Sequence, residues 1–200
     1  MRHQSLPFTG DTQHRPGYTS AEGIHTDAEL ELLLGFLRTR TVPDELATTA
    51  RFAAWLGKHG LVPEGETVEG ATLKRAVHLR SALIGLLREQ AGQPPDPRTR
   101  PAIEAVTKAA PLQVVVDEDR GLQLVPAGMG VDRALAKVVA AAYILAERGS
   151  LERLKVCQGC GWAFFDSTKN HSRIWCDMAT CGSQHKARAY RQRQATARGR

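Results

Sequence analysis

Hydrophobic side chains recur with the period of an α-helix along most of the first 150 residues. The clearest case lies between Thr26 and Thr39, where leucines occupy positions i, i+3, i+4 and i+7 and form one apolar face. Glycine or proline residues follow the later periodic segments and are expected to end them. The same periodicity predicts four further helices, at residues 43–60, 68–91, 103–110 and 131–148.

One segment between the last two of these helices changes to the period of a β-strand. Residues 112–116 form a β-branched run, and residues 122–125 alternate between apolar and polar side chains. The five residues between them are mostly acidic and end in Gly121, which is typical of a turn. The sequence therefore predicts one β-hairpin within the helical domain.

The first 25 residues are rich in Gly, Pro, Thr, His and Gln and show no hydrophobic periodicity. Such a composition favours a disordered segment, because it offers too little apolar surface to offset the entropy lost on ordering. We therefore expect a disordered segment over residues 1–25, a helical domain with its hairpin over residues 26–149, and a second unit over residues 150–200.

All four cysteines of the chain lie in that second unit, with the spacing C-x2-C-x15-C-x4-C. Two pairs of closely spaced thiolates can occupy the four tetrahedral positions around Zn²⁺. Four thiolates leave no coordination position for water, so the ion is expected to be structural rather than catalytic. The predicted zinc ligands are Cys157, Cys160, Cys176 and Cys181.

Two disulfides, a redox dithiol and a histidine ligand are the alternatives to this zinc site. The first 20 residues contain no apolar signal-peptide core, so we expect a cytoplasmic protein with reduced cysteines. Gly159 and Gly161 beside Cys160 are typical of a metal-binding turn rather than of a helix that begins at a redox site. His171 is an alternative ligand, but the four cysteines have better spacing.

Positive charge is concentrated around the cysteines. Residues 151–200 contain ten Lys or Arg and three Asp or Glu, whereas residues 1–150 contain 17 and 18. The whole formal net charge of +6 therefore comes from the cysteine-containing unit. Because Lys and Arg displace counterions from phosphates, this distribution favours a nucleic acid as partner over a basic tail that serves only solubility.

The chain is expected to end in a basic helix, from Ser183 to Gln194, which carries no apolar stripe. Such a helix can lie along phosphates or enter a major groove, where side chains near its start tend to contact bases. Gln184 and His185 are therefore candidates for base contacts. The full set of predicted nucleic-acid contacts is Lys169, Arg173, Gln184, His185, Lys186, Arg188, Arg191 and Arg193.

Catalytic and membrane functions find little support in the sequence. No apolar run approaches the roughly 20 residues of a membrane span. There is no glycine-rich phosphate loop and no recognisable set of nucleophile, base and orienting group, so no catalytic residue is assigned. The expected fold class is α+β, namely a mainly helical domain with one β-hairpin, followed by a small four-cysteine zinc finger with a C-terminal helix.

The segment from Cys157 to Ala187 resembles the CGNR zinc finger family, in its cysteine spacing and in the run Phe164-Phe165-Asp166-Ser167-Thr168-Lys169-Asn170. Members of this family usually carry an upstream ABATE domain of mixed α and β structure and are regarded as stress-responsive bacterial transcription regulators. Residues 32–40, 44–47 and 54–56 look like the beginning of such a domain.

The chain departs from the family pattern at two places in the finger and also in the upstream segment. Ser183-Gln184 stands where the family has Asn-Arg, and Ile174 replaces an arginine before the tryptophan. These changes remove two guanidinium groups, so affinity or sequence choice is expected to differ from that of the family. Upstream, Gly35 and Arg38 replace an Asp and an Asn.

Together the residues and the resemblance predict a bacterial transcription regulator that binds double-stranded DNA and is not an enzyme. The helical domain would sense a small-molecule effector or form a homodimer. One alternative is an RNA-binding zinc module, in which Trp162, Trp175 or Tyr190 stack on unpaired bases. Another is a protein-binding finger attached to a helical domain that is an enzyme of unknown type.

Overall fold

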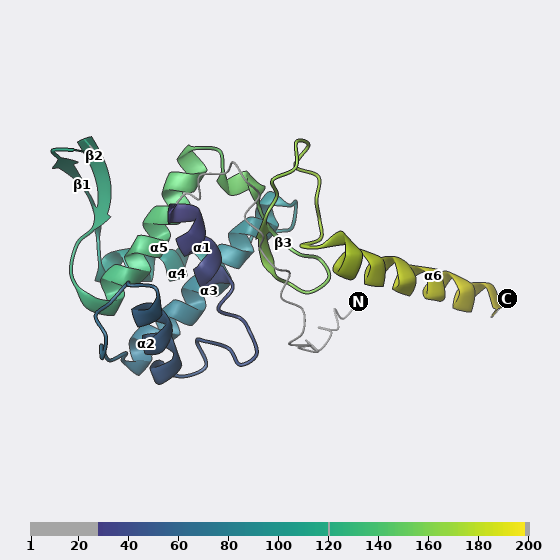
Figure 1. Cartoon of the computed structure of the whole chain (residues 1–200), viewed down its shortest axis with the longest axis horizontal. Coiled ribbons are helices and arrows are strands. Elements are labelled where there is room, and N and C mark those ends of the chain that lie inside the picture. Colours follow the sequence, from purple (N-terminus) through teal and green to yellow (C-terminus); the bar gives the residue numbers. More distant parts are fainter. Residues whose placement is uncertain (1–27, 120, 199–200) are drawn as a thin grey trace.

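The computed structural model describes residues 28–119 and 121–198. The predicted disordered segment, residues 1–25, and the predicted helix start at Thr26 lie outside these residues. The elements of the helical domain are α1 (Ala28–Leu37), α2 (Thr49–Lys58), α3 (Gly70–Gln90), α4 (Thr99–Ala109), β1 (Leu112–Asp117), β2 (Gly121–Pro126) and α5 (Gly130–Glu147) (Figure 1). The remaining elements are η1 (Leu151–Arg153), β3 (Leu154–Val156), β4 (Ala163–Phe165), η2 (Met178–Gly182) and α6 (Ser183–Arg198).

These elements confirm the α+β class, with a helical domain, one β-hairpin in it, and a cysteine cluster followed by a helix. The second helix begins six residues later than predicted, at Thr49 instead of Pro43. The Thr48 hydroxyl accepts a hydrogen bond from the backbone N–H of Arg51 and so caps the helix. In the structure Pro43 belongs to the loop before this cap.

The core of the domain lies between α1, α3 and α5. Phe36, Leu79 and Leu135, one from each helix, are almost completely buried. Trp55 of α2 closes one end of this core, with ring centroids 6.0 Å from Phe36 and 6.2 Å from Phe52. The apolar face that the sequence predicts for each of these helices is therefore the face that packs inward.

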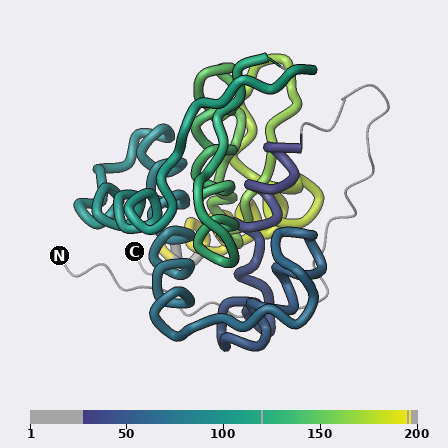
Figure 2. The backbone as a smooth tube through the Cα atoms, turned by 90° about the vertical axis from the view of Figure 1, so that its left-hand side faces the viewer, coloured from purple at the N-terminus to yellow at the C-terminus, as the bar shows by residue number. Residues whose placement is uncertain are grey.

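The predicted hairpin is confirmed as the antiparallel pair β1–β2, in which Val114 faces Leu124 and Val116 faces Leu122. It stands at the end of the molecule opposite α6 in Figure 1 and therefore points toward the viewer in Figure 2. Three apolar side chains near its tip are exposed, Val114 at 66%, Val116 at 79% and Leu122 at 75%.

A second, unpredicted hairpin joins the finger body, residues 154–182, to the helical domain. Its strands β3 and β4 are antiparallel, with Leu154 opposite Phe165 and Val156 opposite Ala163. Leu154 and Ala163 are buried in the same hydrophobic cluster as the helices. Arg38, just after α1, donates from Nε to the Ala163 carbonyl at 2.9 Å. The finger body is therefore packed on the helical domain rather than tethered to it.

One partly buried ion pair ties α3 to the loop before α2. Arg80 is 7% exposed, and its guanidinium donates two hydrogen bonds to the Asp44 carboxylate, at 2.7 and 2.8 Å. A third goes to the buried Thr39 hydroxyl at 3.0 Å. Burial raises the pKa of Asp44, but the hydrogen bonds from Arg80 and from the Leu46 N–H lower it further, so the carboxyl keeps a pKa below its ordinary value.

None of the helices in the described part of the chain combines the length and the apolar character that a membrane span requires.

Replacing Arg80 by methionine is expected to lower the free energy of unfolding by about 3 kcal/mol, because it leaves the Asp44 carboxylate and the Thr39 hydroxyl without their buried donor. Urea denaturation of the full chain measures this. The matched control is Arg75→Met, which removes a more exposed pair with Asp132 and should cost about 1 kcal/mol or less. Equal losses in the two variants would contradict the role given to Arg80.

Candidate metal centre and nucleic-acid interface

The first two cysteines lie in the turn that connects β3 and β4. The N–H of Cys157 donates to the Trp162 carbonyl and the N–H of Gly161 donates back to the Cys157 carbonyl, both at 2.9 Å. Gly161 has a φ of 74°, a left-handed value that favours glycine. The sequence folds here into a tight loop that holds the sulfurs of Cys157 and Cys160 on one side.

The other two cysteines flank a single tight turn at the start of α6. The Asp177 carboxylate accepts hydrogen bonds from the Thr180 N–H at 2.8 Å and from its hydroxyl at 2.7 Å. This cap begins the turn η2, which brings Cys181 back toward Cys176. A Cβ atom on Gly182 would lie 2.9 Å from the Met178 sulfur, so a larger residue where η2 passes into α6 would require the Met178 side chain to move.

The four sulfur atoms form a compact cluster in which all lie within 4.8 Å of one another. The Sγ atoms of Cys160 and Cys176 are 3.6 Å apart, and those of Cys176 and Cys181 are 3.7 Å apart. A tetrahedral Zn²⁺ with Zn–S bonds of about 2.3 Å places its sulfurs about 3.8 Å apart. The four residues that the sequence predicts as ligands are therefore together, at separations that fit this ion.

The thiols also titrate as a cluster. Hydrogen bonds from the thiols of Cys160 and Cys176 lower the pKa of Cys157. The same contacts raise the pKa of Cys160 to about 12 and raise that of Cys176, because each donates to Cys157 and its own ionisation would add a second negative charge beside it. A divalent cation would offset the repulsion between the negative charges of neighbouring thiolates, and it would therefore favour the ionised form of all four cysteines.

His171, the alternative ligand, does not belong to the cluster. It is exposed at the far end of the loop between β4 and Cys176, where its φ of 47° is left-handed. Among the described residues, the four cysteines are the one group of three or more potential metal-ligating side chains that lie close enough to share an ion.

A buried carboxylate organises the loop that follows β4. Asp166 is fully buried and accepts hydrogen bonds from Lys155 Nζ at 2.8 Å, from the N–H and hydroxyl of Thr168, and from the Arg173 N–H at 2.9 Å. Burial raises the pKa of Asp166, but the Lys155 ammonium and the other donors lower it well below its ordinary value. Asp166 is not among the functional residues predicted from the sequence. The one feature that marks it is its position as an acid directly after two phenylalanines, Phe164 and Phe165.

Two of the predicted nucleic-acid contacts are engaged by the finger body itself. The guanidinium of Arg173 lies 5.3 Å from the centre of the Phe164 ring and donates to the Cys176 carbonyl. The His185 ring lies 4.7 Å from the ring of Trp175, a residue that is 7% exposed. Arg173 therefore supports the loop around the cysteines, and His185 attaches the first turn of α6 to the finger body.

The other predicted contacts are exposed. Lys169 lies at the surface of the loop after β4, and the rest are on α6, which projects away from the body of the molecule (Figure 1). This helix carries no acidic residue along its 16 positions. The exposed side chains predicted to contact nucleic acid are Lys169, Gln184, Lys186, Arg188, Arg191 and Arg193.

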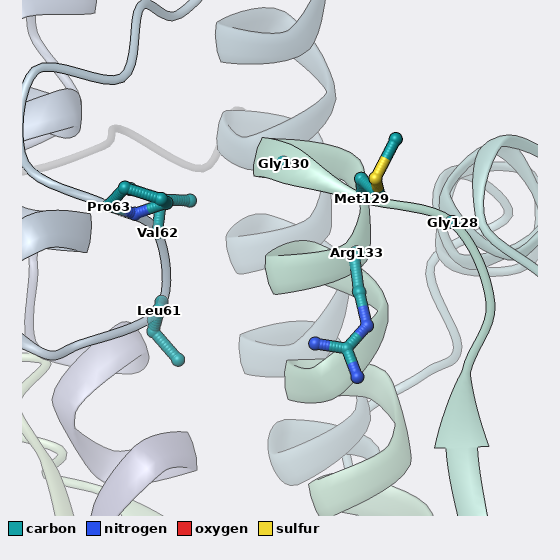
Figure 3. Close-up of a pocket in the computed structure, with 7 residues that line it drawn as sticks. All are labelled: Leu61, Val62, Pro63, Gly128, Met129, Gly130 and Arg133. Atoms are coloured by element: carbon teal, nitrogen blue, oxygen red, sulfur yellow. The ribbon is translucent and has the colours of Figure 1, made fainter.

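A separate opening lies in the helical domain, between the loop at residues 61–63 and the start of α5 (Figure 3). Its volume is about 430 Å³. Leu61, Val62 and Pro63 line one side, and Met129 and Arg133 lie on the other. Arg133 Nε donates to the Pro126 carbonyl at 3.3 Å. The exposed lining of the cleft is thus about equally polar and apolar, with one arginine at its wall.

Comparison with known families gives two matches, one to the helical domain and one to the cysteine-containing unit. Residues 30–147 match the ABATE family, whose description is "Putative stress-induced transcription regulator", and residues 153–194 match the CGNR zinc finger. A search of curated proteins gave no match. The first match covers more than half of the chain, and the second contains all four cysteines. The chain therefore belongs to the ABATE family, with a CGNR zinc finger downstream of its ABATE domain.

Proposed function

We propose that this protein is a cytoplasmic bacterial transcription regulator that binds double-stranded DNA through α6, which a structural Zn²⁺ fixes in place. The observation that carries the proposal is the position of the cysteine cluster at the base of a basic helix. Cys181 lies two residues before Ser183, where α6 begins. An ion held by the four thiolates would thus fix the origin and direction of that helix.

The zinc would be structural, because four thiolates complete its coordination shell. The residues around it supply little apolar burial of their own, since the second hydrophobic cluster consists of three of the cysteines, Phe164 and Trp175, with Trp162 packed against it. A cluster of this size does not hold a fold by hydrophobic contact alone. Binding of the metal would supply the missing free energy.

Five exposed cations support a phosphate-binding role, namely Lys169, Lys186, Arg188, Arg191 and Arg193. The aromatic side chains named for the RNA alternative support stacking less well. Trp175 is buried and lies against His185, and the Trp162 ring is covered by the Arg38 guanidinium, 5.4 Å from its centre. Tyr190, the third of these side chains, is 57% exposed. Because two of the three rings are covered, duplex DNA is the better-supported partner.

The helical domain offers a separate surface for each of the two roles considered for it. The cleft beside Arg133 suits a small effector that carries an anionic group. The exposed tip of the β1–β2 hairpin suits contact with a second copy. Two β1 strands paired antiparallel about Val115 would place Val114 opposite the partner's Val116 and would keep the two Asp117 carboxylates at opposite ends.

Zinc content tests the metal site. The purified chain is expected to carry one zinc per molecule by elemental analysis, and Cys181→Ser should reduce that content and lower the melting temperature, because one ligand and the start of α6 are lost. His171→Ala is the matched control and should keep the full zinc content. Loss of zinc in His171→Ala, or a native chain without zinc, would overturn the assignment of four cysteine ligands.

Salt dependence of duplex binding tests the DNA-binding role. With about five phosphate contacts, log affinity should fall against log salt with a slope of about −4 to −5, and Arg188→Gln with Arg191→Gln should make it shallower by about 2. The control is Arg100→Gln, an exposed arginine of α4, which should leave the slope unchanged. A slope near zero in the native protein would rule out the nucleic-acid role.

Light scattering of the full chain tests the hairpin contact. We expect a dimer that Val116→Asp converts to a monomer, because a carboxylate at a position 79% exposed in one subunit would be buried against the second. Val42→Asp, at an apolar position 52% exposed outside the hairpin, should leave the mass unchanged. A native monomer at every concentration would contradict this assignment.

A further inference from the structure

One side of α6 is already occupied at its base. His185 lies against Trp175, and the Ser183 hydroxyl donates to the Met178 carbonyl at 3.1 Å. DNA that approached α6 from the His185 side would collide with the finger body. The opposite side of the helix is exposed from its first turn onward, so it is the side along which a duplex can lie without meeting the finger body, if the protein binds DNA as proposed above.

The residues on that opposite side follow from the roughly 100° that each residue advances around a helix. Ala187, Tyr190 and Gln194 lie within about 60° of one another, centred opposite His185. All three are exposed, Tyr190 at 57%. Gln194 Nε2 donates to the Tyr190 hydroxyl at 3.3 Å, so these two side chains form a pair on this face. This face, defined by Ala187, Tyr190 and Gln194, is called the outer face below.

Cations flank the outer face on both sides. Arg188 and Arg191 lie about 60–120° around the helix in one direction, and Lys186 and Arg193 lie about 80–100° around it in the other. All four are exposed. Gln184 falls on the same flank as Arg188 and Arg191, about 80° from the centre of the outer face.

This arrangement matches the cross-section of a helix in a major groove. The groove is about 12 Å wide and admits one helix, so side chains on the two flanks meet the phosphates of the two strands while the innermost face meets the base edges. Ala187, at the first turn of the outer face, keeps a small side chain there and lets the backbone approach the bases closely. The charges thus bracket the outer face rather than cover it.

We propose that α6 enters the major groove with its outer face toward the bases, and that Gln194, oriented by Tyr190, selects an A·T base pair. The Gln194 amide can accept from the N6 amino group of adenine and donate to N7, a bidentate contact. Its Nε2 carries two hydrogens, so one can stay on the Tyr190 hydroxyl while the other meets N7. Gln184 then faces a phosphate, and His185 faces the finger body. The inference rests on the DNA-binding role proposed above.

The test is selection of preferred sites by the zinc-loaded full chain from a pool of randomised duplexes, followed by competition between the selected duplex and single-base variants. Gln194→Ala should reduce the discrimination between the A·T pair and a G·C pair at one position by about 10-fold, since a good bidentate contact is removed. Tyr190→Phe should reduce it in the same direction. Arg188→Gln should weaken binding to every duplex equally.

Gln192→Ala is the matched control, because Gln192 is an exposed glutamine of the same helix on the His185 side. It should leave both affinity and discrimination unchanged. The inference would be overturned if Gln194→Ala kept the discrimination between the A·T and G·C pairs while Gln184→Ala or Gln192→Ala lost it. The DNA-binding role would still stand in that case. Absence of any duplex binding at low salt would instead overturn the proposed function, and the inference with it. Circular dichroism of each variant checks that α6 is still formed.

Discussion

The finger body depends on a hydrophobic core that it shares with the helical domain. Leu154 and Ala163, from its two short strands, are 1% and 2% exposed and belong to the same cluster as the buried leucines of α1 and α3. Full burial of a leucine side chain such as that of Leu154 stabilises the folded state by roughly 1.5–3 kcal/mol. The finger body has few apolar side chains of its own, and its two strands are therefore buried in the core of the helical domain. The position of the cysteines relative to α1 is set by this contact.

Arg38 strengthens the same junction from the side of the helical domain. It stands where the family pattern has an asparagine, and its longer side chain reaches both the Ala163 carbonyl and the Trp162 ring. An asparagine at this position would be too short to cover that ring. The departure from the family pattern therefore coincides with a contact between the two parts of this chain. Ile174, another of the departures, is 46% exposed and leaves an uncharged surface beside Trp175.

The sequence predicts those features that depend on neighbours along the chain. The helices follow from a period of about 3.6 residues, and the grouping of the four cysteines follows from two closely spaced pairs, each closed by a local turn. The hairpin β1–β2 follows from a run of valines and an acidic turn. In each case the residues that determine the structure lie within one element or one turn.

Local sequence patterns do not predict features that depend on contacts between residues far apart along the chain. Strands β3 and β4 are three residues each, too short to show alternation, and they exist because α1 and α3 cover them. The sequence predicts a phosphate contact at Arg173 from its charge, but it does not reveal that the Arg173 guanidinium lies over the Phe164 ring of β4. The late start of α2 has the same origin, since the residues before Thr48 include Asp44, which Arg80 holds from another helix.

The length of α6 gives the shared core a mechanical consequence. Its 16 residues, at about 1.5 Å each, make an arm about 24 Å long, fixed at one end to the finger body. A tilt of about 10° at its base would move the far end by about 4 Å, close to the roughly 3.4 Å step between stacked base pairs. Leu154 and Ala163 pack directly on the helical domain. A small shift of α1 or α3 that tilted the finger body would therefore move the C-terminal end of α6 by a distance similar to the rise of one base pair.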